Sequence, residues 1–328
     1  MIEQFGAPDV MRWAERPVPA RGPDQVTVGV EAIGVNFADT MVRRGEYRRD
    51  QPLDFVPGFE VAGRVLESRP GGPPPGTAVV AFTEDGGGYA DTVVVDSDHV
   101  FTVADGISSA QAAALFTQGV TAWYSVHRYG CVRAGESVLV HAGSGGLGAL
   151  CIQLAVGAGA EAIATASSEE KRAIARGHGA RIALPADPES LTAAVRAATG
   201  GRGADVVIDG VGGPLFTPSL RALAFSGRYV VVGSASQQPA QLDVRSLMPR
   251  GQTVVGFVVA RVAEEDPSEP QRAFDEVQRR FAAGELRPAV TVMGTGDIAR
   301  VHEQIEARTL TGKVVLSFDA PPRSQRKG

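Results

Sequence analysis

The chain has 328 residues, of which 44% are hydrophobic and 21% charged, and its formal net charge is −5. This length suggests about two domains and a large apolar core. Because no stretch approaches about 18 apolar residues and no basic region precedes an apolar run, we expect neither a membrane span nor a secretory signal. The acidic balance argues against nucleic-acid and membrane partners, and two cysteines favour a reducing cytoplasm.

The first third of the chain is predicted to be rich in β-strands. Glycine- and proline-rich turns separate short β-branched runs, which predict strands at 25–30, 61–67, 78–82 and 92–95. Another strand is expected to begin at residue 1. This spacing is typical of a compact, barrel-like β domain.

From about residue 118 the pattern changes to alternating strands and helices. The strands are predicted at 137–142, 162–166, 181–184, 206–209, 227–233 and 253–259. The helices between them are predicted at 146–157, 169–177, 190–198 and 213–223. Continuous apolar strands between helices indicate an α/β domain whose parallel sheet is doubly wound. The last elements are expected to be a helix at 270–283, strands at 289–293 and 314–318, and a disordered tail at 321–328.

The strongest motif lies between a predicted strand and a predicted helix, where Gly143, Gly145 and Gly148 form a GxGxxG pattern. In that context the pattern predicts a dinucleotide-binding turn, because the glycines allow a tight turn and a close approach of backbone N–H groups to a pyrophosphate. The predicted cofactor contacts in this turn are Ser144, Gly145, Gly146 and Leu147.

The residues after the second strand of this domain bear on the choice between NAD and NADP. An NAD site usually places a carboxylate there, to bind the ribose 2′-OH. Here Ser167 and Ser168 follow the strand, and Lys171 lies in the first turn of the next helix. Two hydroxyls and a cation suit a 2′-phosphate, so we predict NADPH. Glu169 and Glu170 leave open that Lys171 is only paired on the surface, or that the acids serve NAD.

Further segments carry a resemblance to a known family. They are GVNFADTMVRRGEY (34–47), PGFEVAGRV (57–65), GGYADTVVV (87–95), GVTAWYSV (119–126), ADVVIDGVGG (204–213), GRYVVVG (227–233) and TGKVVL (311–316). Over nearly all of 1–318 the chain resembles the zinc-free, quinone oxidoreductase-like branch of the medium-chain dehydrogenase/reductase superfamily. The resemblance implies a GroES-like β-barrel catalytic domain at 1–117 and 285–328, and a Rossmann NADPH-binding domain at 118–284.

The resemblance also implies an activity. Members of that branch reduce quinones or activated alkenes with NADPH, and polyketide-synthase enoyl reductase domains are similar. Relatives that bind catalytic zinc carry Cys where Phe37 or Ala38 stands and His where Phe59 stands, so no metal is expected. The substrate stays open between a small quinone or enone and a polyketide-like or thioester-bound intermediate. An NADPH-binding protein without catalysis is the alternative from another class.

By resemblance, Asn36 and Tyr47 are the candidate catalytic residues. Hydride addition leaves negative charge on the substrate's carbonyl oxygen, which needs hydrogen-bond donors and a proton source. A phenol can donate at neutral pH, although Tyr47 as a pocket wall with solvent as the proton source stays open. Met41 stands where bacterial quinone reductases carry a second tyrosine, and this makes the pocket more apolar.

Other contacts are carried over by position. Arg228 and Tyr229 are candidates for the adenine or phosphate side, with Arg228 as a surface residue the alternative. Asp209 is expected to cap a turn and His141 to pack. A homodimer formed through the strand at 253–259 is also implied. The remaining cofactor contacts implied are Thr121, Gly210, Val211, Val232, Gly233, Ser234, Phe257, Val258 and Lys313.

Overall fold

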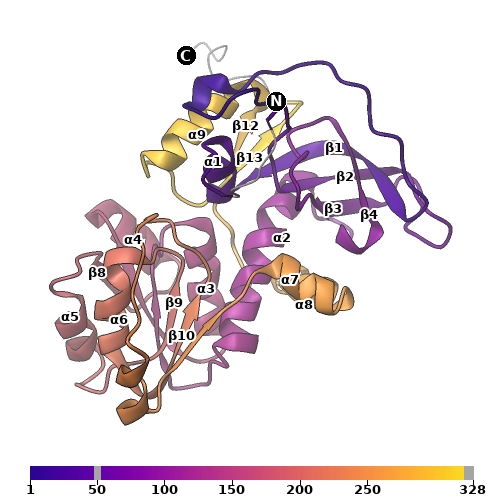
Figure 1. Cartoon of the computed structure of the whole chain (residues 1–328). Helices are drawn as coiled ribbons and strands as arrows, with labels where there is room; N and C mark the ends of the chain where they lie inside the picture. Colours follow the sequence, from indigo (N-terminus) through magenta and orange to yellow (C-terminus); the bar gives the residue numbers. More distant parts are fainter. Residues whose placement is uncertain (48–52, 321–328) are drawn as a thin grey trace. The chain divides into compact units, whose positions relative to one another are not determined.

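The computed structural model describes residues 1–47 and 53–320 and divides the chain into two compact units (Figure 1). The first unit comprises Met1–Thr117, Ala263–Gln278 and the chain from Ala289 onward, and the second comprises Gln118–Val262 and Arg279–Pro288. The tail at 321–328, predicted to be disordered, lies outside the described residues. Within the described ranges, no helix combines the length and apolarity that a bilayer crossing requires.

The first unit is built on a β-sheet with seven strands in the described part of the chain. Its order is β12-β13-β1-β2-β3-β5, and β4 pairs with β1. The last strand pairs antiparallel with the first, so the C-terminal segment completes the β domain. The bounds are β1 Gln25–Val35, β2 Glu60–Glu67, β3 Ala78–Phe82, β4 Thr92–Asp96, β5 Val100–Thr102, β12 Val290–Gly294 and β13 Lys313–Ser317.

Alternating valines build the core of this unit. Val26 and Val28 of β1 are fully buried and lie in one cluster with Val61 and Val65 of β2, as the two-residue period of a strand requires. The expectation of a strand from residue 1 is wrong. Ile2 makes only isolated bridges, to Phe55 and Met11, and a 3-10 turn follows at Pro8–Val10.

The sequence reading missed several helices. Helix α8 lies close to the helix predicted at 270–283, whereas α1, α2, α7 and α9 were not predicted. Helix α2 runs directly into a π-helical turn at Tyr124–Tyr129. The bounds are α1 Phe37–Arg43, α2 Ser109–Trp123, α7 Val259–Glu265, α8 Ser268–Ala282 and α9 Ile298–Glu306.

The second unit contains a parallel sheet in the order β11-β10-β9-β6-β7-β8. Its strands are β6 Ser137–Val140, β7 Glu161–Ala166, β8 Ile182–Pro185, β9 Ala204–Asp209, β10 Leu223–Val231 and β11 Thr253–Gly256. Its helices include α3 Gly146–Gly157, α4 Glu169–Gly177, α5 Leu191–Ala198 and α6 Phe216–Ala222.

Helices cover both faces of this sheet. Leu139 and Ile163 share one apolar cluster with Val195 of α5 and Phe216 of α6. On the other face, the space beside Gly143 is filled by side chains from β7, α3 and α4. The predicted fold class, a GroES-like β domain with a doubly wound Rossmann domain, is therefore confirmed.

Two predicted elements of the second unit were wrong at their ends. The β-branched run at 253–259 forms a strand only to Gly256, and Val259 already begins α7. The predicted helix at 213–223 is a 3-10 turn at Gly213–Leu215 followed by α6, and Leu223 begins β10. In both segments side-chain type alone did not reveal where the backbone changes direction.

Candidate active site

The glycine turn lies between β6 and α3, as predicted. Gly145 is the N-cap of α3 and brings no capping side chain, and a helix leaves the N–H groups of its first turn without intrahelical acceptors. A Cβ at Gly148 would collide with the Ala142 carbonyl oxygen. The turn therefore brings backbone donors and the positive end of the helix dipole to one place, which suits a pyrophosphate.

A buried histidine holds the strand that leads into this turn. His141 Nδ1 lies 2.9 Å from Thr165 Oγ1, and its Nε2 lies 2.8 Å from Ser219 Oγ. Burial lowers the pKa of His141, which keeps the ring neutral. Because both ring nitrogens are engaged by hydroxyls, His141 is a structural residue, as predicted.

A second turn follows β9 and is organised by Asp209. Its Oδ1 accepts hydrogen bonds from the N–H groups of Val211 and Gly212, at 2.7 and 2.9 Å. The prediction that Asp209 caps a turn is confirmed. The Ala235 N–H donates to Gly210 O at 3.0 Å, which ties this turn to the segment after β10.

The two turns bring several predicted cofactor residues together. Leu147 Cδ2 would lie 3.9 Å from a Cβ at Gly210, and Ser234 Oγ would lie 3.5 Å from a Cβ at Gly212. Val232 and Gly233 lie between β10 and Ser234. These residues are therefore grouped at the carboxyl ends of β6, β9 and β10, where doubly wound sheets bind ligands.

The residues predicted to select NADPH lie at the end of β7. Ser168 is the N-cap of α4, and its Oγ accepts from the Lys171 N–H at 3.3 Å. Glu169, one of the two acids near Lys171, forms ion pairs with Arg172 and Arg176. A hydrogen bond with Ser168 lowers the pKa of Glu170.

Phe257 belongs to an aromatic group around the π-helical turn. Its ring stacks on Tyr129 at 4.5 Å between centroids and meets the edge of Tyr124 at 6.0 Å. Val258, by contrast, is 56% exposed. Thr121 lies on α2, just before the same turn, and its carbonyl accepts from Ser125 Oγ at 2.7 Å.

Gln118 is a polar residue beside the glycine turn that the sequence analysis missed. Its Oε1 is buried and has no hydrogen-bond partner among the described residues. A Cβ at Gly146 would collide with this oxygen, so the carboxamide lies against the start of α3. An unsatisfied buried acceptor at this position is consistent with a site that a ligand completes.

In the first unit, Asn36 and Lys313 are joined by a residue that was not predicted to act. Lys313 Nζ donates to Asn36 Oδ1 at 2.7 Å and to Glu60 Oε2 at 2.8 Å. Lys313 and Glu60 have side-chain exposures of 1% and 0%. Nothing in the local sequence signals this pair, because its members are 253 residues apart.

Tyr47 belongs to a row of aromatic rings in the first unit. Its ring centroid lies 5.2 Å from that of Phe59, which in turn stacks on Phe82 at 6.4 Å. Tyr47 is 42% exposed, so its ring is anchored on one side and accessible on the other.

Two further candidates do not take the positions proposed for them. Arg228 pairs with Glu136 and donates to the Cys131 carbonyl at 3.0 Å. Tyr229 is fully buried and donates to Asp209 Oδ2 at 2.6 Å. Both side chains are held by the protein itself, so neither is directed toward an adenine or a phosphate.

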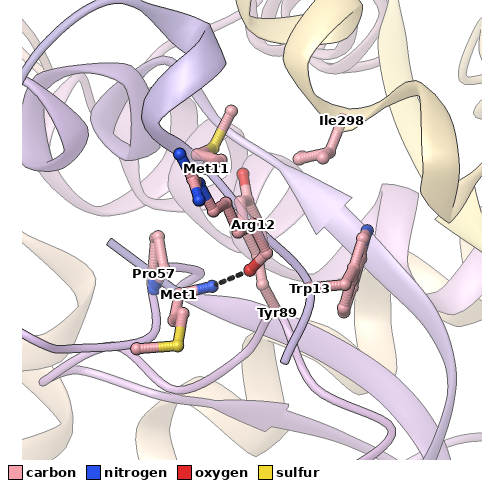
Figure 2. Close-up of a pocket in the computed structure, with 7 residues that line it drawn as sticks. All are labelled: Met1, Met11, Arg12, Trp13, Pro57, Tyr89 and Ile298. Atoms are coloured by element: carbon pink, nitrogen blue, oxygen red, sulfur yellow. Dashed lines mark hydrogen bonds between the residues drawn. The ribbon is translucent and has the colours of Figure 1, made fainter. Parts of the chain in front are cut away.

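A small pocket in the first unit lies apart from these residues (Figure 2). In it the Met1 ammonium donates to the Arg12 carbonyl at 2.6 Å. None of the predicted catalytic residues lines it. The lining residues are Met1, Met11, Arg12, Trp13, Pro57, Tyr89 and Ile298.

Comparison with known proteins agrees with this arrangement. Residues 22–105 match the alcohol dehydrogenase GroES-like domain, and residues 146–279 match the zinc-binding dehydrogenase model. The quinone oxidoreductase of Sus scrofa is 30% identical over 320 residues, covering 96% of this chain and 96% of the porcine protein. A mycobacterial structure complexed with NADPH is 32% identical with a TM-score of 0.89, covering 96% of this chain and 98% of that one.

A larger relative matches through one segment. The phthioceranic/hydroxyphthioceranic acid synthase of Mycobacterium bovis is 32% identical over 309 residues, which cover 92% of this chain and 14% of the synthase. Fold, turns and relatives together define the class: the chain belongs to the medium-chain dehydrogenase/reductase superfamily. Within that superfamily it is a member of the quinone oxidoreductase-like branch.

The name of one matching model implies zinc, which needs Cys, His or carboxylate ligands. Phe37, Ala38 and Phe59 occupy the positions predicted to have lost the ligands, and their side chains carry no donor atom. Across residues 1–47 and 53–320, no group of three or more His, Cys, Asp or Glu side chains is arranged to hold a metal ion. Among the described residues, the donor set does not fit zinc.

Proposed function

We propose that the protein is an NADPH-dependent oxidoreductase that transfers a hydride to a quinone or an activated C=C bond without zinc. The observation that carries this proposal is the grouping of Leu147, Gly210 and Ser234 around the uncapped start of α3. Backbone donors and small residues at the carboxyl ends of parallel strands suit a dinucleotide. The NADPH-complexed relative supports the same cofactor.

Different residues of the chain are proposed to bind different parts of NADPH. The N–H groups of Gly146 and Leu147 hold the pyrophosphate, while Ser167, Ser168 and Lys171 hold the 2′-phosphate. Charge-assisted hydrogen bonds to a phosphate are stronger than neutral ones, so these three residues carry the preference over NADH. The remaining contacts proposed are Thr121, Ser144, Gly145, Val211, Val232, Gly233, Phe257 and Val258.

The reaction requires groups that stabilise negative charge on the substrate and supply a proton. Bound NADPH supplies the hydride. Negative charge then accumulates on the carbonyl oxygen of the substrate, and the half-exposed Tyr47 hydroxyl donates a proton or hydrogen bond to it. Asn36 is the second polar group proposed for this step: its Nδ2 donates at 3.2 Å to Gly34 O and to Glu60 Oε2, and we propose that the substrate oxygen takes the place of one of these acceptors. No step is assigned to a metal, since the donor atoms of the residues that the structure describes do not fit one.

A second candidate substrate is a polyketide-like or thioester-bound enoyl intermediate. The match to a segment of the Mycobacterium bovis acid synthase favours it. Met41, near the N-terminal catalytic residues in sequence, adds an apolar side chain where quinone reductases carry a tyrosine, and this suits an aliphatic substrate.

A substrate panel tests the function. Purified protein is mixed with NADPH and, separately, with a naphthoquinone, a 2-enone and an enoyl thioester, and NADPH oxidation is followed by absorbance. We expect turnover of at least one substrate and no loss after treatment with a zinc chelator. NADPH binding without turnover of any member would replace the proposal with a non-catalytic binding protein.

Assembly and location are also proposals. We propose a homodimer, supported by the position of β11 at the edge of its sheet, and a sizing measurement that gives one chain's mass would contradict it.

We propose a cytoplasmic location, supported by two cysteines that form no disulfide.

A further inference from the structure

We propose that Glu60 and Lys313 are positioning residues that fix the orientation of the Asn36 carboxamide. Lys313 then acts through Asn36 and does not bind the cofactor. The inference deepens the proposed function, because it concerns a residue proposed to act on the substrate.

The hydrogen bonds allow one orientation of the carboxamide. Lys313 Nζ can only donate, so the atom 2.7 Å from it must be the oxygen of Asn36. Asn36 Nδ2 then donates to Gly34 O and to Glu60 Oε2, both at 3.2 Å. The backbone holds the same residue, since the Asn36 N–H donates to Asp39 Oδ2 at 2.7 Å.

Glu60 is itself fixed by the backbone. Its Oε1 accepts from the Thr117 N–H at 2.7 Å, which leaves Oε2 for Lys313 and Asn36. A Cβ at Gly34 would lie 2.6 Å from the Ala113 carbonyl oxygen and would also collide with Glu60, so only glycine leaves room for the carboxylate.

The burial of the Glu60–Lys313 pair suits a role in fixing the Asn36 carboxamide. Lys313 and Glu60 are almost fully excluded from solvent. Because Lys313 Nζ is already bonded to Asn36 and Glu60 and is shielded from solvent, we place the ammonium behind Asn36 and not on the cofactor. A buried ion pair is weak evidence for stability, whereas its use in fixing one arrangement is better attested.

A double variant separates positioning from folding. Lys313→Met alone leaves a buried carboxylate without its cation and is expected to be strongly destabilised. Combining it with Glu60→Gln removes both charges. The carboxamide at position 60 must point its oxygen at the Thr117 N–H, so its NH2 group faces the NH2 group of Asn36. Two donors cannot bond to each other, so the Asn36 carboxamide must turn over to present its oxygen.

The double variant is compared with wild type and with Arg64→Met, which removes a cation from the exposed ion pair between Arg64 of β2 and Glu31 of β1. We expect the double variant to unfold near the wild-type temperature and to bind NADPH within twofold of wild type by fluorescence titration. Its kcat with the best quinone should fall about tenfold or more, as misplacement of a positioned group implies. Arg64→Met should retain wild-type kcat.

A second readout does not depend on turnover. The side-chain NH2 signals of Asn36, assigned by their loss in Asn36→Asp, should exchange slowly with solvent in wild type and at least tenfold faster in the double variant. If wild type reduces no substrate, the proposed function fails, and this exchange measurement alone decides the positioning.

Three results would overturn the inference. Full kcat in a folded double variant would make the pair merely structural. Weakening of NADPH binding by more than about fivefold in the double variant would place Lys313 on the cofactor. Unchanged exchange of the Asn36 signals would show that the pair does not orient this carboxamide.

Discussion

The Tyr229 hydroxyl donates a 2.6 Å hydrogen bond to Asp209 Oδ2 in the interior of the second unit. The other oxygen of the same carboxylate accepts from the N–H groups of Val211 and Gly212. One buried carboxylate thus links the core of the sheet to the turn proposed to bind NADPH.

Removing this phenol should loosen the turn. Tyr229→Phe keeps the ring and leaves Asp209 Oδ2 buried without its donor, so we expect the free energy of unfolding to fall by about 1–3 kcal/mol. Urea denaturation followed by circular dichroism measures the change. A decrease below about 0.5 kcal/mol would mean that the bond adds nothing to stability.

Lys171→Ala should change the preference between the two cofactors. Loss of a charge-assisted bond to the 2′-phosphate, worth about 1.5–3 kcal/mol, should raise the KM for NADPH at least tenfold and leave that for NADH nearly unchanged. Arg176→Ala is the matched control, because this cation of α4 is paired with Glu169. Equal effects on NADPH and NADH would remove Lys171 from the 2′-phosphate site.

Tyr47→Phe should lower kcat. The ring keeps its contact with Phe59, 5.2 Å away, while the hydroxyl is lost. General acid catalysis contributes about 100-fold or more, so a fall of that order is expected in steady-state assays with the best quinone. A kcat within about threefold of wild type would leave Tyr47 as a wall of the pocket and solvent as the proton source.

The glycine turn should reject a methyl group. Gly148→Ala brings a Cβ into collision with the Ala142 carbonyl oxygen, so we expect a lower melting temperature and weaker NADPH binding. Gly177→Ala is the control, since no heavy atom lies within 4 Å of its added Cβ. That variant should be unchanged or slightly more stable. Normal binding in Gly148→Ala would contradict the close packing described here.

Two buried groups in the first unit should give opposite dependences of stability on pH. Burial raises the pKa of Asp39 to about 7, against the effects of the Asn36 N–H and Lys313. Above its ordinary pKa of 3.8, the unfolded chain releases a proton that the folded state keeps, so stability is lost as pH rises toward 7. Burial lowers the pKa of His302 to about 3, so stability is lost as pH falls from 6.5 toward 3.

Each single variant should therefore reveal the other group. In Asp39→Asn the free energy of unfolding should fall as pH decreases between about 6 and 4, and in His302→Asn it should rise, each with a limiting slope near about 1.4 kcal/mol per pH unit. Urea denaturation across this range measures the slopes. Parallel curves for the two variants would show that these groups do not titrate as described.

The sequence predicted what depends on local pattern. The glycine turn, the parallel strands and the capping role of Asp209 are encoded within a few neighbouring residues, and the structure has them where expected. Helix α1 was missed because only seven residues form it, too few for a hydrophobic period to show.

What the sequence could not predict depends on contacts between distant residues. Glu60 was visible only as part of a family motif, and its meeting with Lys313 requires β13 to pair beside β1. Tyr229 was taken for a ligand-side residue because its position in chain order does not say which face of β10 it occupies. Tyr229 lies on the core face of β10, where its ring centroid is 4.9 Å from that of Phe216.

The pairing of β1 with β13 also bears on how the chain is made. During synthesis the N-terminal strands leave the ribosome long before residues 313–317. Until then the Ala32–Val35 part of β1 lacks its β13 partner, and Glu60 lacks the Lys313 cation. The second unit, by contrast, is nearly continuous from Gln118 to Val262. We therefore expect the nucleotide-binding half to fold first, and a nascent chain stopped before residue 313 to depend on chaperones.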